Sequence, residues 1–179
     1  IDFDALSRII EQQIAGGTNY FVMLGTTGES VTLSKEEKAA VVTHIKTVNA
    51  GRLPLVLGVG GNYTSEVVNQ LKSLDTNGLT AILSVSPYYN KPNQQGILHH
   101  YKEVADNSPL PIILYNVPGR TGSNMTAATQ LELAKHPNIV ATKEASGNME
   151  QVMTLLANKP HDFLVISGDD ALTLPILAC

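Results

Sequence analysis

Several residue types and patterns are scarce in this chain of 179 residues. Its one cysteine, Cys179, excludes an internal disulfide, which is compatible with the reducing cytoplasm where we expect the protein to act. The 12 basic residues form no run and are outnumbered by 16 acidic ones, so we expect no nucleic acid and no membrane as a partner. The apolar stretches are shorter than a membrane span, and no signal-peptide pattern opens the chain.

Short runs of β-branched and aliphatic residues recur along the chain, and amphipathic segments fill the gaps between them. The starts of these runs lie roughly 24 to 33 residues apart, the spacing of a strand, a crossover helix and the next strand. Near-continuous hydrophobicity is typical of strands that are buried on both faces of a parallel sheet. The six runs are Tyr20–Gly25, Leu53–Gly60, Ala81–Pro87, Pro111–Val117, Ile139–Ala145 and Phe163–Gly168.

Helix signals occupy the gaps. Ser34 and Glu37 have the spacing of a capping box, in which each residue's side chain bonds the backbone N–H of the other. Further helix starts are predicted at Asp4, Thr64, Asn93 and Thr126. We expect the first helix to run into Gly16-Gly17 and the helix from Thr64 to end by Gly78, because glycine readily adopts the left-handed conformation that closes a helix.

Strict β/α alternation leaves two architectures, an open doubly wound sheet or a (β/α)₈ TIM barrel. Candidate polar residues follow the ends of four different runs, at Thr26, Tyr115, Lys143 and Gly168-Asp169. In a barrel the carboxyl ends of all strands carry the chemistry, whereas an open sheet usually binds its ligand at one switch point. The sequence therefore favours the barrel, with residues 1–179 as part of one catalytic domain.

Lys143 is the most distinctive candidate, because it alone among the lysines ends an apolar run. If its strand parity faces the barrel interior, burial would lower its pKa. A free lysine, with a pKa of about 10.4, is neutral in only about one molecule in 2,500 at pH 7, and a neutral amine can attack a ketone. The alternative is a lysine paired with Glu144 or with another carboxylate at the rim.

Other candidate residues permit a structural role as well as a chemical one. Tyr115 could transfer protons beside an imine or could simply be an aromatic at the edge of the core, and the same holds for Tyr88-Tyr89. The loop Gly25-Thr-Thr-Gly-Glu-Ser30 suits a carboxylate or phosphate, although a tight turn would explain its glycines. Arg120 is either solvated or aimed at a substrate carboxylate. No residues have metal-ligand or dinucleotide-binding spacing, so we expect no metal and no cofactor.

Taken together, five motifs resemble the dihydrodipicolinate synthase family, in order and in spacing, over nearly the whole chain. They are Gly25-Thr-Thr-Gly-Glu-Ser30, Pro87-Tyr-Tyr-Asn90, Tyr115-Asn-Val-Pro-Gly-Arg-Thr121, Lys143-Glu-Ala-Ser-Gly147 and Ser167-Gly-Asp-Asp170. The first and fourth are shared broadly by pyruvate-dependent lyases. The third is more specific, since related sialic acid and keto-sugar-acid lyases generally lack its arginine.

The resemblance implies condensation of pyruvate with L-aspartate 4-semialdehyde, a step toward lysine and diaminopimelate. By this resemblance Lys143 would form the Schiff base and Tyr115 would move protons. Thr26 and Tyr89 would complete a hydroxyl relay, with Tyr89 supplied across a dimer interface. The residues implied for substrate binding are Thr27 and Gly168 for pyruvate and Arg120 for the carboxylate of the semialdehyde. The family forms dimers or tetramers, so a homo-oligomer is expected.

Against the eight strands of the family's barrel, the chain contains the second to the seventh. We expect the first strand, the eighth strand and the C-terminal helical region to be missing. An isolated fragment with two unpaired strand edges is expected to aggregate, exchange elements or multimerise, without normal turnover.

The resemblance also extends to a site where some members of the family bind free lysine as an inhibitor. The matching residues are Ser30, Asn62, Glu66 and Tyr88. Lys35 and Lys38 stand where lysine-sensitive members often carry histidine, and added positive charge disfavours a cationic effector. The sequence therefore predicts weak or absent inhibition by lysine.

Two alternatives remain. The same scaffold could belong to a lyase for sialic acid or a keto-deoxy sugar acid, in which Arg120 would matter little. It could also be a barrel that binds pyruvate or a related metabolite without turnover, since a fold alone does not determine function.

Overall fold

The computed structural model describes residues 1–179 and contains six β-strands, each lying inside one of the six predicted runs. The strand order follows the chain, β1-β2-β3-β4-β5-β6, with helices between the strands, and this confirms the α/β class. The chain folds as two compact units. The first comprises Ile1–Gly58 and Asp75–Ile82, and the second comprises Val59–Leu74 and Leu83–Cys179. Strand β3 (Ala81–Val85) begins in the first unit and ends in the second.

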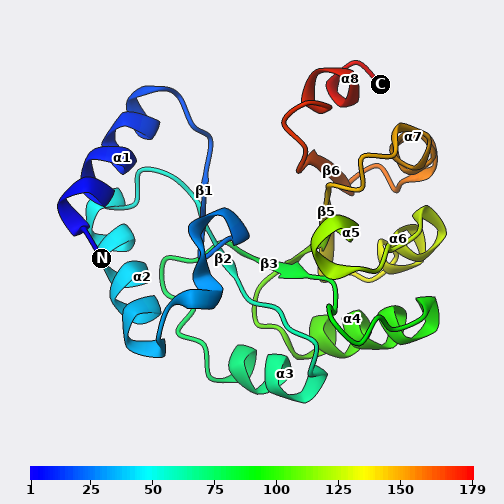
Figure 1. The fold of residues 1–179 in the computed structure, drawn as a ribbon, viewed down its shortest axis with the longest axis horizontal. Helices are drawn as coiled ribbons and strands as arrows, with labels where there is room; N and C mark the ends of the chain where they lie inside the picture. Colours follow the sequence, from blue (N-terminus) through cyan, green and yellow to red (C-terminus); the bar gives the residue numbers. More distant parts are fainter. The chain divides into compact units, whose positions relative to one another are not determined.

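The first unit pairs two helices with two strands. Strand β1 is parallel to β2, with Phe21 opposite Leu55. Helices α1 and α2 lie side by side, where the rings of Phe3 and His44 have centroids 4.9 Å apart (Figure 1). The elements of this unit are α1 (Phe3–Ala15), β1 (Phe21–Met23), the 3₁₀ turns η1 (Thr26–Gly28) and η2 (Ser30–Thr32), α2 (Lys35–Asn49) and β2 (Leu55–Gly58).

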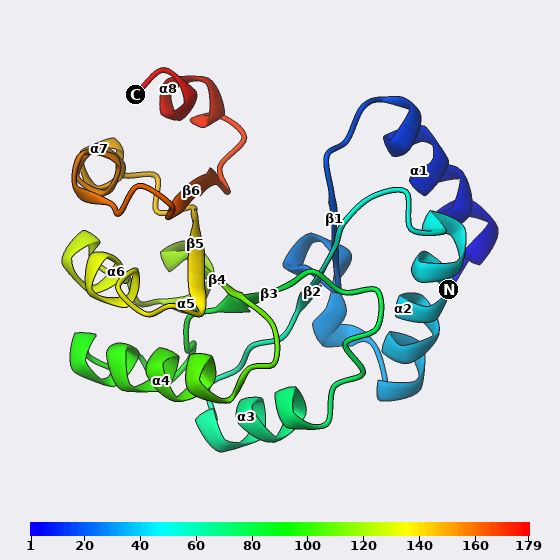
Figure 2. The same ribbon diagram turned by 180° about the vertical axis from the view of Figure 1, so that it is seen from behind.

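The second unit carries the longer part of the chain. Strands β4, β5 and β6 are parallel neighbours, and helices α4, α6 and α7 follow one another along one side of them (Figure 2). The elements of this unit are α3 (Thr64–Lys72), α4 (Gln94–Asn107), β4 (Ile112–Asn116), α5 (Pro118–Thr121), α6 (Ala127–Leu133), β5 (Ile139–Glu144), α7 (Met149–Asn158), β6 (Leu164–Ser167) and α8 (Thr173–Leu177).

Three predicted helix starts have the expected caps. At α2 the Glu37 N–H donates to Ser34 Oγ at 3.1 Å, and the Ser34 N–H donates to Glu37 Oε2 at 2.8 Å, which completes the capping box. Asn93 caps α4 and Thr126 caps α6 through their side-chain oxygens. These caps satisfy backbone donors that a helix leaves free at its first turn.

The predicted cap of α1 was wrong. Asp2, and not Asp4, is the N-cap, and its carboxylate accepts from the Ala5 N–H at 2.8 Å. Asp2 has the extended backbone that a cap requires, while Asp4 lies within the first turn, where a negative charge favours the helix dipole. The helix does run into Gly16 as predicted, and Gly17 is left-handed with φ 83°.

The prediction that Gly78 is the left-handed residue closing α3 was also wrong. The helix begins at Thr64 but ends at Lys72, well before Gly78. Ser73 Oγ donates to the carbonyls of Asn69 and Gln70, which gives these terminal acceptors a partner without a left-handed residue. Gly78, with φ 73°, belongs instead to the turn before β3.

Burial differs among the strands. All five residues of β4 are buried, as are the first three of β2, in keeping with the prediction of strands covered on both faces. Strand β6 is different, with Leu164 59% exposed, since β5 is its one neighbour in the sheet.

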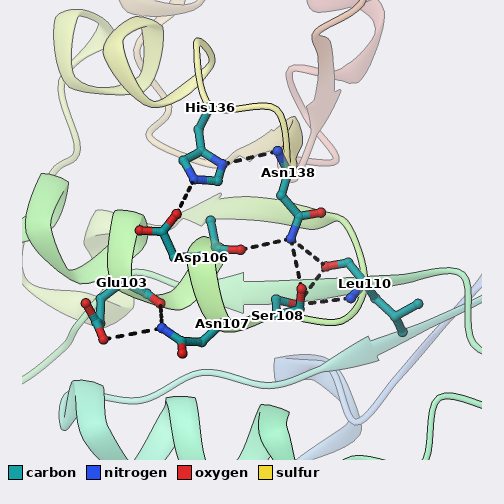
Figure 3. Close-up of polar contacts among 8 residues, drawn as sticks. Glu103, Asp106, Asn107, Ser108, Leu110, His136 and Asn138 are labelled. Carbon is teal, nitrogen blue, oxygen red and sulfur yellow. Dashed lines mark hydrogen bonds and ion pairs between the residues drawn. The ribbon is translucent and has the colours of Figure 1, made fainter.

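A polar cluster fixes the turns that precede β4 and β5 (Figure 3). The Asn138 side-chain amide donates to three backbone carbonyls, those of Ala105, Ser108 and Leu110. His136 Nδ1 accepts from the Asn138 N–H at 3.1 Å, so its Nε2 carries the proton and donates to Asp106 at 3.0 Å. The amino ends of the two strands are thereby held together, which supports their register.

Candidate active site

The register of β4 and β5 brings Tyr115 and Lys143 together at the carboxyl ends of their strands. The two residues lie directly opposite one another, and the Lys143 Nζ is 4.6 Å from the centre of the Tyr115 ring. Tyr115 is buried, with 7% of its surface exposed, and Lys143 is half-buried. An ammonium over an aromatic face is attracted by the ring, so this contact also orients the lysine.

Burial makes the Lys143 amine easier to deprotonate than the amine of a free lysine. Burial lowers the pKa of the Lys143 amine from its ordinary value, and the Asp170 carboxylate acts more weakly in the opposite direction. The alternative of an ion pair with Glu144 is not observed. Glu144 follows Lys143 on the strand, points to the other face and has its own set of hydrogen-bond donors. The lysine is thus available for nucleophilic chemistry.

Gly168 leaves room for the lysine side chain. A Cβ at this position would lie 3.0 Å from Lys143 Cε and 3.1 Å from its Cγ. The Gly168 N–H donates to the Glu144 carbonyl at 2.8 Å, which holds the chain after β6 against the end of β5. Gly168 therefore contacts the candidate nucleophile, next to which pyruvate was expected to bind.

Arg120 lies in the short helix α5, which follows β4. Its side chain is exposed and makes no hydrogen bond or ion pair. Gly122 ends the helix with φ 71°, and the Lys91 side chain packs against it, 2.9 Å from where a Cβ would stand. A rigid turn thus presents an unpaired guanidinium beside strand β4, an arrangement suited to a carboxylate.

The residues of the expected lysine site lie in both units. In the second unit the Asn62 side-chain amide donates to the Tyr88 carbonyl at 3.2 Å, which brings these two together. Glu66 is exposed in the first turn of α3 and has no side-chain partner, and Ser30 begins η2 in the first unit. Next to Tyr88, Tyr89 is 86% exposed and has a left-handed backbone with φ 70°.

Thr26 and Thr27 begin the 3₁₀ turn η1, which is separated from the end of β1 by two residues in the first unit. Both are exposed, and neither hydroxyl has a partner in the chain. The turn ends at Glu29, which is left-handed with φ 51°. The roles expected for the two threonines remain predictions.

The sequence did not indicate the buried polar network that lies on the opposite face of β4 and β5 from Tyr115 and Lys143. The Glu144 carboxylate is 1% exposed and accepts hydrogen bonds from Asn116, Gln130, Gln151 and the Ser146 N–H. One signal was available, since Asn116 and Glu144 each follow a candidate residue at the end of an apolar strand. The two glutamines gave none, because a helix pattern does not tell which polar side chain points into the core.

Two other features bear on the type of site. No group of three or more His, Cys, Asp or Glu side chains is placed to hold a metal ion. No helix is both long enough and apolar enough to cross a membrane.

The fold and the site together define a parallel α/β protein with a half-buried lysine and a phenol at the carboxyl ends of adjacent strands. The model of the dihydrodipicolinate synthetase family matches residues 1–179, and the chain belongs to that family.

Individual relatives agree with this assignment. The chain is 57% identical, over 178 residues, to the 4-hydroxy-tetrahydrodipicolinate synthase of Flavobacterium psychrophilum, covering 99% of this chain and 61% of that protein. A dihydrodipicolinate synthase structure from Cyanidioschyzon merolae, with lysine bound, matches with a TM-score of 0.92 and 44% identity over 99% of this chain and 60% of that one. A dihydrodipicolinate synthase structure from Acinetobacter baumannii, complexed with pyruvate, matches with a TM-score of 0.94 and 41% identity, covering 99% of this chain and 61% of that one. The chain thus spans about three fifths of the length of these relatives.

Proposed function

We propose that the chain is part of an enzyme that condenses pyruvate with L-aspartate 4-semialdehyde to give 4-hydroxy-tetrahydrodipicolinate. The observation that carries the proposal is the amine of Lys143, half-buried with a lowered pKa, over the ring of Tyr115. Relatives that share about half of its residues bear the name of this synthase. Residues 1–179 would then be the part of a (β/α)₈ TIM-barrel catalytic domain that holds its second to seventh strands.

The chemistry begins at Lys143. Its neutral amine attacks the keto carbon of pyruvate, and loss of water from the resulting carbinolamine gives an iminium ion. Removal of a proton from the methyl carbon of pyruvate forms an enamine, which adds to the aldehyde carbon of the second substrate. The amine of that substrate then attacks the imine carbon and closes the ring, which frees the lysine.

Tyr115 is proposed to carry the protons in these steps. Its phenol lies beside the amine and can donate a proton to the departing water or accept one from the methyl carbon. Thr26 and Tyr89 would connect it to solvent, since a chain of hydroxyls moves protons without leaving a charge on any buried group. Tyr89 would come from a second copy of the chain in a dimer or tetramer, and its 86% exposure supports a role outside its own unit.

Three residues are proposed to accommodate the substrates. Thr27 would bind the pyruvate carboxylate, and Gly168 would leave the space that the bound pyruvate and the lysine share. The exposed and unpaired Arg120 would bind the carboxylate of the semialdehyde. We place the enzyme in the cytoplasm, where its biosynthetic substrates would be found.

Free lysine is proposed to inhibit weakly or not at all. Ser30, Asn62, Glu66 and Tyr88 would form the effector site, and the Asn62–Tyr88 contact supports two of the four. Lys35 and Lys38 would add positive charge beside a cationic effector. Inhibition of the full-length enzyme by micromolar lysine would contradict this part of the proposal.

The test is a trapping experiment on the full-length protein. Incubation with pyruvate and sodium borohydride should leave one reduced pyruvyl adduct, mapped by peptide mass spectrometry to Lys143. No adduct on folded protein would refute the mechanism. Trapping without turnover of the semialdehyde would indicate a binding protein instead. If Arg120→Ala left turnover of the semialdehyde unchanged, a different second substrate, such as a sugar acid, would be indicated.

A further inference from the structure

A buried carboxylate lies immediately behind the candidate lysine. The Asn116 Nδ2 donates to both oxygens of Glu144, at 3.1 Å and 3.2 Å. Gln130 Nε2 donates at 2.7 Å, Gln151 Nε2 at 3.2 Å and the Ser146 N–H at 2.8 Å. The donors therefore come from strand β4, from helices α6 and α7, and from the loop after β5. One side chain joins four segments of the second unit.

Every partner of Glu144 is a donor, and none is a cation. A carboxylate has two oxygens that only accept, so it suits a position where several N–H groups converge. Glutamine at position 144 would have nearly the same size, but its NH₂ group would meet N–H groups from its neighbours. Buried N–H donors that face other donors have no hydrogen-bond acceptor and are destabilising, so the site favours glutamate over glutamine.

The carboxylate sits one residue beyond the candidate catalytic pair. Asn116 is opposite Glu144 in the register of β4 and β5, just as Tyr115 is opposite Lys143. Because side chains alternate along a strand, the Asn116–Glu144 contact lies on the face opposite the lysine and the phenol. The contact holds the two strand ends at a fixed separation at the point where they carry the reacting groups.

We propose that Glu144 is a positioning residue for the lysine chemistry, an inference that rests on the proposed function. By fixing the backbone of Lys143 against that of Tyr115, it sets the geometry in which the amine and the phenol share protons. The rates of amine attack and proton transfer are sensitive to changes of a few tenths of an ångström in the distance between the reacting atoms. A long lysine side chain does not fix this distance by itself. The network on the far face supplies that definition.

The experiment compares Glu144→Gln with the wild type in the full-length protein, following the borohydride-trapped adduct over time at saturating pyruvate. We expect the first-order rate of adduct formation to fall tenfold or more. The pyruvate concentration for half-maximal rate should change less than threefold, because the substrate's own contacts remain. Glu150→Gln is the matched control, since it makes the same change of charge at an exposed position of α7.

The outcomes separate the possible failures. A purely structural role for Glu144 would reduce the amount of protein that reacts but leave the rate of the folded fraction unchanged, and this result would overturn the inference. If Glu144→Gln does not fold, Gln151→Met removes one half-exposed donor, and its adduct should form several-fold more slowly at full amplitude. An unchanged rate in that variant would also overturn the inference. A wild type that forms no adduct would instead refute the proposed function.

Discussion

Replacing Gly168 with alanine would introduce a single methyl group against the candidate nucleophile. The new Cβ would stand 3.0 Å from Lys143 Cε, 3.1 Å from its Cγ and 3.0 Å from Ala145 Cβ. Gly168 does not need the left-handed conformation, so alanine adds no backbone strain there. The substitution therefore tests the space that Lys143 and Ala145 leave at this position, with no change in charge or polarity.

The size of the effect follows from the contacts. Non-bonded carbons rest at about 3.5–4.0 Å, so the lysine side chain would have to move by about 0.5 Å. A misplacement of 1 Å can cost about 100-fold in rate, and half of that displacement corresponds to about tenfold if the barrier rises in proportion. The overpacking should also lower the free energy of unfolding by about 1 kcal/mol, since much of the clash is relieved by a flexible side chain.

The assay is the rate of pyruvate trapping by borohydride at pH 8, with the free energy of unfolding measured in urea. Gly119→Ala is the matched control, because a Cβ at that position would meet nothing within 4 Å and the residue is not left-handed. We expect the control to trap pyruvate at the wild-type rate.

The opposite result would be informative. If Gly168→Ala trapped pyruvate as fast as the wild type and unfolded at the same urea concentration, Lys143 would not occupy the space observed here during the reaction. The contact between Gly168 and Lys143 would then have no role in the mechanism.

Three further predictions concern pH and stability. The rate of trapping should rise with pH through a midpoint below that of a free lysine, and Asp170→Asn should move the midpoint lower still, because this carboxylate raises the pKa of Lys143; an unchanged midpoint would exclude that influence. Ser34→Ala should lower the free energy of unfolding by about 1 kcal/mol through loss of the capping box, a loss visible in thermal melts. Burial lowers the pKa of His100 from 6.5 to about 4. The unfolded chain binds this proton at higher pH than the folded one, so the free energy of unfolding should fall by about 3 kcal/mol as the pH drops from 6.5 to 4. In urea titrations, His100→Gln should make this pH dependence weaker.

The strands were predictable because their signal is local and redundant. Each of the six runs contains several consecutive apolar residues, so no single position decides the assignment. The capping box at Ser34 was equally predictable, since both partners lie within one turn. Helix boundaries were less so, because Asp2 and Asp4 are chemically equivalent candidates and only the path of the backbone distinguishes them.

The candidate site likewise contains residues with a local sequence signal and residues without one. Lys143 and Tyr115 could be singled out because each ends an apolar strand, and their contact then follows from the register of β4 and β5. The network around Glu144 could not, because it depends on the direction in which Gln130 and Gln151 leave their helices. Those directions are set by packing between helices, which no local pattern encodes.

The loop after β3 has a consequence for how this protein could be engineered. Tyr89 and Lys91 both hold left-handed backbones, which cost about 1–2 kcal/mol for each residue with a side chain, and Tyr89 also leaves 86% of its surface in water. Glycine at position 89 would relieve the strain and remove an exposed ring, so a search for thermal stability alone would select it. If Tyr89 enters a second copy of the chain as proposed, such a variant should fold more stably but turn over substrate more slowly, and the loss of rate would measure the contribution of the tyrosine to the neighbouring site.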